Sequence, residues 1–224
     1  MTTIVAVYTG QGLSEIVQRI FKEQLPDCRL INIIDDSIIH DVIKEGKPSK
    51  KIIQRLLKYF QIGADIGADI IINTCSSVGD VVDIARKIID VPIVRIDEPM
   101  AKRAVEKYKH IGVLATLPTT LDPTARLIKS QAALSGKEVV ITEGLAEGAY
   151  HALINGKPEE HDRLIFETAR KISRDVECIV LAQGSMTRMQ DRLTREIQKE
   201  ILASPPLCAE YVKSLLGGLA NEQG

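Results

Sequence analysis

Short Ile- and Val-rich runs alternate along the chain with longer stretches whose apolar residues recur at helical spacing. Strands that are apolar on both faces are typical of parallel sheets covered by helices on both sides, so the pattern predicts an α/β fold. In the first half we predict strands at Ile4–Tyr8, Arg29–Ile34, Asp69–Asn73 and Pro92–Ile96, and helices at Leu13–Gln24, Ser49–Gly63, Val78–Ile89 and Pro99–Tyr108.

The second half of the chain repeats the order of the first. No Ser- or Pro-rich linker separates the halves, so we expect a change of folding unit rather than a tether. The expected architecture is two flavodoxin-like α/β/α lobes with parallel sheets, related by a pseudo-twofold, with the active site in the cleft between them. Residues 1–106 would form the first lobe, joined by a closing helix at 209–224, and residues 107–208 the second. The predicted elements are strands at His110–Thr116, Glu138–Thr142 and Cys178–Ala182 and helices at Glu159–Arg174 and Ala209–Leu216.

Local signals predict where three of the helices begin or end. Asp122-Pro123 offers an Asp cap with Pro at the first helical position, and Lys157-Pro158 precedes two acids of a first turn. Gly217-Gly218 is expected to end the closing helix.

Composition narrows the classes of function. The 29 basic and 30 acidic residues nearly cancel, no basic stretch is interleaved with aromatics, and Trp is absent, which argues against nucleic-acid binding. A small-molecule ligand is therefore expected. The chain starts without a signal-peptide pattern and has no apolar run of membrane-spanning length, so we expect a cytoplasmic protein without membrane contact. Four widely spaced cysteines argue against a zinc site and for free thiols.

Small polar residues follow four of the predicted strands. Open parallel α/β sheets bind ligands at the carboxyl ends of their strands, where hydroxyls and backbone amides together can hold a carboxylate. The alternative is that each Ser or Thr only caps the following helix. The candidate substrate-binding residues are Thr9, Gly10, Asn73, Thr74, Ser76, Ser77, Thr116, Thr119, Thr120 and Gly184.

Cys75 is the candidate reactive group in these loops. It leaves a strand into a polar loop ahead of the helix predicted from Val78. Because a helix N-terminus stabilises a thiolate, we expect a lowered thiol pKa and a role as base or nucleophile. The alternative is a small buried hydrophobe, which fits Cys178 inside its strand. A weaker copy of the Cys75 pattern places Gln183 at the matching position of the second half, so the thiol is present in one half only.

Four segments carry a resemblance that covers nearly the whole chain. They are Asn73–Ser77, Val91–Val94 with Asp97–Pro99, Ile111–Thr116 and Val180–Met186. Together with the duplicated architecture, they resemble the aspartate/glutamate/hydantoin racemase superfamily. The resemblance implies cofactor-independent chemistry at the carbon next to a carboxylate or carbonyl, and a homodimer or higher oligomer. In the family's racemases, one cysteine removes the proton as a thiolate and a second returns one from the opposite side.

Carried over by position, Cys75 matches the first cysteine of that pair. Thr116, Thr119 and Thr120 match the loop that holds a carboxylate. The second cysteine of the family would fall at Gln183, and an amide does not carry a transferable proton. Relatives with an altered thiol pair, such as arylmalonate decarboxylase and maleate isomerase, make one-cysteine chemistry an open alternative.

Two other groups could supply the missing proton or hold charge. Cys208 either lies near the cleft or packs the closing helix, and packing is the favoured reading. Ser185 is too weak an acid to replace a thiol, but with Gly184 it could hold an oxyanion through its hydroxyl and amide.

Three functions follow as hypotheses. The first is a racemase or epimerase of a small carboxylic acid or amino acid, with Cys75 as thiolate acid/base and Gln183 and Ser185 as further catalytic residues. The second is a decarboxylase or other lyase that uses one cysteine. The third is an anion-binding relative without catalysis. We expect no cofactor and no metal. A dinucleotide-binding pattern at Gly10-Gln11-Gly12 is weaker, because Glu15 replaces its third glycine and would repel a pyrophosphate.

Overall fold

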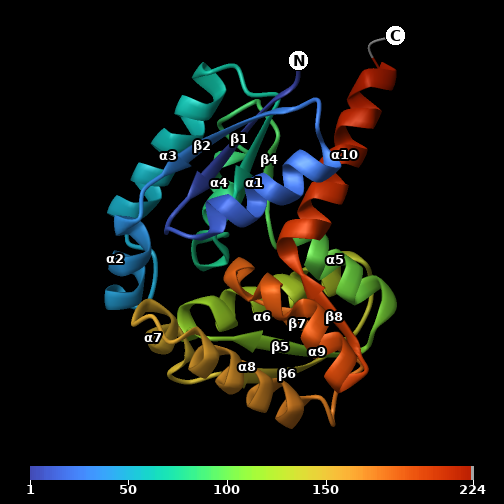
Figure 1. The fold of residues 1–224 in the computed structure, drawn as a ribbon. Helices are drawn as coiled ribbons and strands as arrows, with labels where there is room; N and C mark the ends of the chain where they lie inside the picture. The colour runs from blue at the N-terminus through green and yellow to red at the C-terminus, as the bar shows by residue number, and fades with distance from the viewer. Residues whose placement is uncertain (223–224) are drawn as a thin grey trace. The chain divides into compact units, whose positions relative to one another are not determined.

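The computed structural model describes residues 1–222, and within this range the strands form two parallel sheets of four strands each. The chain divides into two compact units (Figure 1). The first unit comprises Met1–Pro99 and the chain from Pro205 onward, and the second comprises Met100–Ser204. The predicted α/β class with parallel sheets is confirmed. The change of unit after Pro99 comes earlier than the expected residue 106, because most of the helix Glu98–Lys107 (α5) belongs to the second unit.

The first unit has strand order β2-β1-β3-β4. Because β1 is followed by β2 on one side and pairs with β3 on the other, the strand order reverses between β1 and β3. Such a reversal is where α/β sheets bind ligands. The elements are β1 (Thr3–Tyr8), α1 (Leu13–Gln24), β2 (Arg29–Ile34), α2 (Ser37–Glu45), α3 (Lys50–Asp65), β3 (Ile70–Asn73), the 3-10 turn η1 (Ser76–Val78), α4 (Val81–Ala85), β4 (Ile93–Arg95) and α10 (Ser204–Glu222).

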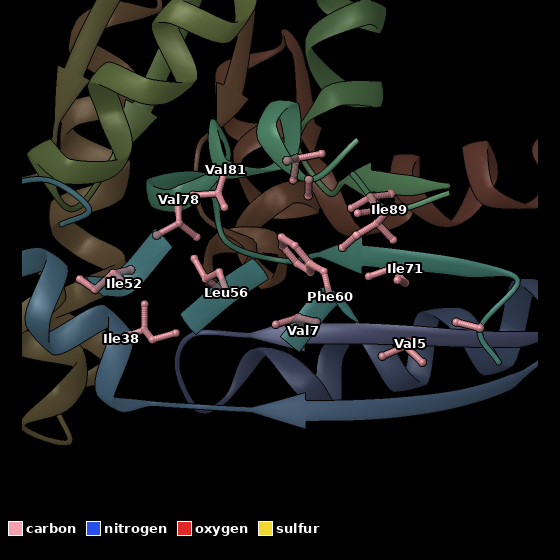
Figure 2. Close-up of a cluster of buried hydrophobic side chains, with 14 of the residues drawn as sticks. Val5, Val7, Ile38, Ile52, Leu56, Phe60, Ile71, Val78, Val81 and Ile89 are labelled. Atoms are coloured by element: carbon pink, nitrogen blue, oxygen red, sulfur yellow. The ribbon is translucent and has the colours of Figure 1, made fainter. Parts of the chain in front are cut away.

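Two apolar layers cover the faces of this sheet. On one face, Val5 and Val7 of β1 and Ile71 of β3 pack with side chains of α2, α3 and α4, Phe60 among them (Figure 2). On the other face, alternate strand residues pack with α1 and α10. The alternation follows the two-residue period of a strand, and it explains why these strands are apolar throughout.

The second unit repeats the topology, with strand order β6-β5-β7-β8. Here α7, α8 and α9 pack on one face of the sheet, whereas α6 contacts β5 and β6. The elements are α5 (Glu98–Lys107), β5 (His110–Ala115), α6 (Pro118–Leu134), β6 (Val140–Leu145), α7 (Ala149–Ile154), α8 (Pro158–Ile172), β7 (Cys178–Leu181), the 3-10 turn η2 (Gly184–Met189), α9 (Gln190–Ile197) and β8 (Glu200–Ala203).

Two predicted helix ends are wrong. The helix expected to start at Asp122-Pro123 begins at Pro118, which already occupies the first turn, so Pro123 lies inside α6. Asp122 pairs with Arg126 one turn later instead of capping. The closing helix continues through Gly217 and Gly218 to Glu222, because neither glycine adopts the positive φ that would end it.

Two further local differences concern helices of the first unit. The helix predicted at Val78–Ile89 is a 3-10 turn followed by the short α4. The helix α2 was not predicted, and His40 lies at an exposed position of it. In the part of the chain that the structure describes, no helix is both long and apolar enough to span a membrane.

Candidate active site

Cys75 lies two residues beyond β3, at the carboxyl edge of the first sheet. The Thr74 amide and hydroxyl both donate to the carbonyl of Val7, at 3.1 and 2.9 Å, which ties the end of β3 to β1. The Asn73 side-chain amide donates to the Cys75 carbonyl at 3.0 Å. These bonds hold the backbone of Cys75 in an extended conformation ahead of the η1 turn.

The sulfur of Cys75 accepts several hydrogen bonds. Burial raises the pKa of the Cys75 thiol, while hydrogen bonds from the Thr9 hydroxyl, from the Ser77 amide and hydroxyl and from the Val78 amide act to lower it, and burial dominates. The sequence predicted the opposite direction from a helix N-terminus. That prediction is wrong because burial outweighs the hydrogen bonds to the sulfur, and the turn after Cys75 has only three residues, since the α-helix begins at Val81.

Neighbouring polar residues at this edge are mostly buried. Thr9, Asn73, Thr74, Ser76 and Ser77 are all shielded from solvent. The Asn73 side-chain oxygen is buried and has no hydrogen-bond partner among the described residues, so it is an acceptor that a ligand N–H or O–H group could satisfy. Gly10 lies beside them, and a Cβ added there would contact Ile39 at 3.4 Å.

In the second unit, Gln183 and Thr116 are joined at the carboxyl edge of β7 and β5. The Thr116 amide and hydroxyl both donate to Gln183 Oε1, at 2.6 and 3.0 Å. Because a backbone N–H is only a donor, the atom facing Thr116 must be the oxygen of the amide. Gln183 therefore occupies both donors of Thr116 with its own oxygen, and its Nε2 group carries two further N–H donors.

The remaining predicted residues of this edge lie in α6 and η2. The Thr119 hydroxyl is buried without a hydrogen-bond partner among the described residues, whereas the Thr120 amide donates to the Leu117 carbonyl at 3.1 Å. Gly184 and Ser185 begin η2 and are half-buried. These positions match the strand-end placement expected for an anion-holding loop.

Sequence reasoning missed the side chains that anchor η2. Arg188 forms an ion pair with both carboxylate oxygens of Asp162, and its Nη2 lies 3.1 Å from the Nδ1 of the buried His161. His161 and Asp162 lie in α8, far from Arg188 in the chain. No local pattern could have revealed this contact, since it depends on how α8 packs beside η2.

The two fully buried cysteines belong to apolar layers. Cys208 packs in the first unit with Tyr8 and Val212, so the favoured packing interpretation holds, and burial raises its thiol pKa. Cys178 is fully buried in β7, and burial raises its thiol pKa to about 12. At neutral pH both groups are protonated thiols inside the fold. In residues 1–222, no group of three or more His, Cys, Asp or Glu side chains is placed to hold a metal ion.

Asp35, at the end of β2, accepts hydrogen bonds from Tyr59 at 2.7 Å and from Ser37 at 2.6 Å. Arg55 lies 3.1 Å away. Burial acts to raise the pKa of Asp35, but these hydrogen bonds and the Arg55 charge outweigh it and lower the pKa. The carboxylate therefore joins α2 and α3 to the end of β2. In a dinucleotide-binding fold, the acidic residue would instead bind a ribose hydroxyl.

Asp35→Asn should destabilise the protein by about 1–2 kcal/mol at neutral pH, as expected for lost hydrogen bonds to a charged group. A carboxyl whose pKa is lower in the folded state stabilises the fold above its unfolded pKa, and this contribution disappears as the pH falls through the folded pKa. Urea unfolding at several pH values should thus show wild type and variant converging in acid. Asp41→Asn, which removes a half-exposed carboxylate 3.6 Å from the same Arg55, is the control and should change little. A difference that stays constant down to about pH 2 would contradict the proposed ionic contribution.

Solved structures of several racemases are similar to this chain. Glutamate racemase isoform RacE1 from Bacillus anthracis is 14% identical, with a TM-score of 0.78 over 97% of this chain and 82% of that one. Allantoin racemase from Klebsiella pneumoniae is 16% identical, with a TM-score of 0.70 over 97% of this chain and 88% of that one. Glutamate racemase from Francisella tularensis is 15% identical, with a TM-score of 0.76 over 98% and 82%. At these identities the likeness shows the shared two-lobed α/β fold.

A comparison with curated protein sequences finds no match. The family model for Asp/Glu/Hydantoin racemase matches residues 5–212, which is nearly the whole chain and includes both sheets. The match agrees with the duplicated fold and with the strand-end segments that carried the resemblance. The chain belongs to the Asp/Glu/hydantoin racemase family.

Proposed function

We propose that this protein is a cofactor-independent isomerase, a racemase or epimerase that acts at the carbon alpha to a carboxylate of a small acid or amino acid. Membership of the racemase family supports a racemase-type isomerase. The observation that carries the proposal is the sulfur of Cys75, which accepts hydrogen bonds from Thr9, Ser77 and Val78 at the carboxyl edge of the first sheet. Those donors act against burial to lower the thiol pKa, and so assist formation of the thiolate, the form that removes a proton from carbon.

In the proposed reaction, the Cys75 thiolate takes the alpha proton and the electron pair of the broken C–H bond spreads onto the substrate carboxylate. The Thr9-Gly10 loop, at the same sheet edge as Cys75, is the proposed holder of that charge, because hydroxyls and amides placed in advance stabilise an enediolate better than reorganising water does. Return of a proton to the opposite face completes the inversion, and water or a hydroxyl group is its proposed source.

A single-cysteine lyase is the second candidate, and two observations favour it. Burial raises the pKa of Cys75, which favours the protonated thiol, the form that can donate a proton. Gln183 is bound to Thr116 through its oxygen and supplies no transferable proton. In this reaction the bond between the alpha carbon and one of two carboxylates breaks, carbon dioxide leaves, and Cys75 protonates the resulting enediolate.

Incubation in heavy water separates these candidates. The test substrates are alpha-amino and alpha-hydroxy dicarboxylates, a 5-substituted hydantoin, allantoin and a 2-arylmalonate, with proton NMR and carbon dioxide release as the readouts. We expect loss of the alpha-proton signal without carbon dioxide release. Carbon dioxide release would instead establish the lyase. Binding without exchange or turnover of any of these compounds, together with a Cys75 that resists alkylation, would leave only an anion-binding relative.

We further propose that the side-chain amide of Gln183 donates to an anionic substrate, and Gln183→Glu tests this role. Glutamate keeps an oxygen for both Thr116 donors but replaces the Nε2 donors with a negative charge, so KM for an anionic substrate should rise about tenfold or more. The fold should be unaffected in thermal unfolding. Gln198→Glu, an exposed position of the same unit, adds the same charge and is the control. An unchanged KM in Gln183→Glu would remove Gln183 from the proposed site.

A further inference from the structure

Arg95, at the end of β4, is a buried arginine with two carboxylate partners. Its side chain is 4% exposed. Its Nε and Nη2 donate to the two oxygens of Asp97 at 3.1 and 3.2 Å, and its Nη1 donates to Asp80 at 3.3 Å. A buried charge is tolerated only when it is paired with good geometry, so these bonds fix the plane of the guanidinium.

The guanidinium of Arg95 lies directly against Gly79. A Cβ added to Gly79 would lie 2.3 Å from Nη2 and 2.4 Å from Cζ of Arg95. The φ of Gly79 is −56°, which every residue adopts, so the backbone itself does not require glycine. Glycine is needed at this position because the arginine occupies the space of a side chain.

Gly79 ends the same turn that supplies donors to Cys75. Within it, the Val78 amide lies 3.3 Å from the Cys75 carbonyl and the Gly79 amide lies 3.1 Å from the Ser76 carbonyl. A three-residue 3-10 turn has weak internal hydrogen bonds and little stability of its own. Support from outside the turn is therefore required, and Arg95 supplies it from the neighbouring strand, where it pairs in register with Asn73.

We propose that Arg95, held by Asp97, is a positioning residue for Cys75. Its guanidinium packs against Gly79 and holds the turn so that the Ser77 and Val78 amides point at the sulfur. Asp97 and Asp80 offset the charge of Arg95, so it acts through geometry rather than through its field. The inference builds on the proposed role of Cys75, but it is tested on the thiol itself and not on turnover.

The test compares alkylation of Cys75 by iodoacetamide across a range of pH, measured on the Cys75 peptide by mass spectrometry. The principal variant is the double substitution Arg95→Met with Asp97→Asn, which removes both charges and so avoids an unpaired buried carboxylate. The midpoint of the rate profile should move to higher pH, and the thiolate fraction at neutral pH should fall about fivefold, because donors that favour the thiolate are lost. The midpoint is the readout because it does not depend on how easily the reagent reaches the sulfur.

Two further variants and a control accompany the double substitution. Gly79→Ala displaces the guanidinium while keeping both charges, and should move the midpoint in the same direction. Arg95→Lys keeps one charge but not the planar two-point contact, so it should restore the wild-type profile only in part. Arg86→Met is the matched control, because Arg86 bonds to the Ile93 carbonyl and to Glu98 in the same unit.

An unmoved midpoint in folded Gly79→Ala and in the folded double variant would overturn the proposal. An equal shift in Arg86→Met would also overturn it, because the effect would then be general loosening. If the double variant does not fold, Gly79→Ala decides alone. If the profiles shift as expected but Cys75→Ser retains turnover, the positioning role stands and the proposed chemistry of Cys75 fails.

Discussion

Cys75→Ser is expected to lower the rate of alpha-proton exchange by about a thousandfold or more, because a serine hydroxyl is a far weaker acid and its anion is inaccessible near neutral pH. The substitution changes one atom, and the hydrogen bonds from Thr9, Ser77 and Val78 can be made to an oxygen as well as to a sulfur. The fold should therefore survive. The measurement is loss of the alpha-proton NMR signal in heavy water for whichever carboxylate the wild type turns over.

Cys28→Ser is the control for this experiment. Cys28 is a free, half-buried thiol of the same unit, and no catalytic role is proposed for it. Its replacement should leave exchange unchanged. Full turnover in Cys75→Ser would show that the assignment of the chemistry to this thiol is wrong, whereas loss of activity in both variants would point to a general requirement for intact thiols.

Phe60→Ala is expected to destabilise the first unit by about 3–5 kcal/mol, as is typical for deletion of a fully buried phenylalanine. Phe60 lies in α3 with no exposed surface, and it belongs with Leu56 and the strand residue Ile71 to the apolar layer of Figure 2. Removal of the ring loses its transfer free energy and leaves a cavity that rigid strands close only in part. Since a domain is stable by about 5–15 kcal/mol, the variant should lose a large share of that margin.

Urea unfolding followed by circular dichroism measures this loss. Ile62→Ala is the control, because Ile62 lies in the same helix but is 44% exposed, and its replacement should change the free energy of unfolding by about 0.5 kcal/mol or less. A loss below about 1 kcal/mol in Phe60→Ala would mean that the layer collapses readily around the missing ring, contrary to the close packing described. Separate unfolding of the two units would appear as two transitions, of which only one should move.

Much of the first unit could be predicted from local pattern. The helix at Leu13–Gln24 and the strand at Arg29–Ile34 have the predicted bounds, because their apolar spacing and flanking polar residues agree. The local sequence pattern gave wrong helix ends where two local signals competed. Asp122-Pro123 has the form of a helix start. The helix has already begun at Pro118, however, and this proline occupies its first turn. Gly217-Gly218 resembles a stop, but a glycine ends a helix only if the chain turns there.

The sequence by itself determined the duplicated α/β fold, the family and the lone thiol that follows β3, since all three depend on order and spacing along the chain. Only the tertiary structure decided the surroundings of that thiol. Burial raises the pKa of Cys75 against the expectation from sequence, Gln183 places its oxygen on the donors of Thr116, and Arg95 lies on Gly79. Each of these three features depends on residues that are distant in the chain and meet through strand pairing and side-chain packing. A hydrogen bond or a desolvation energy exists only once that packing has formed.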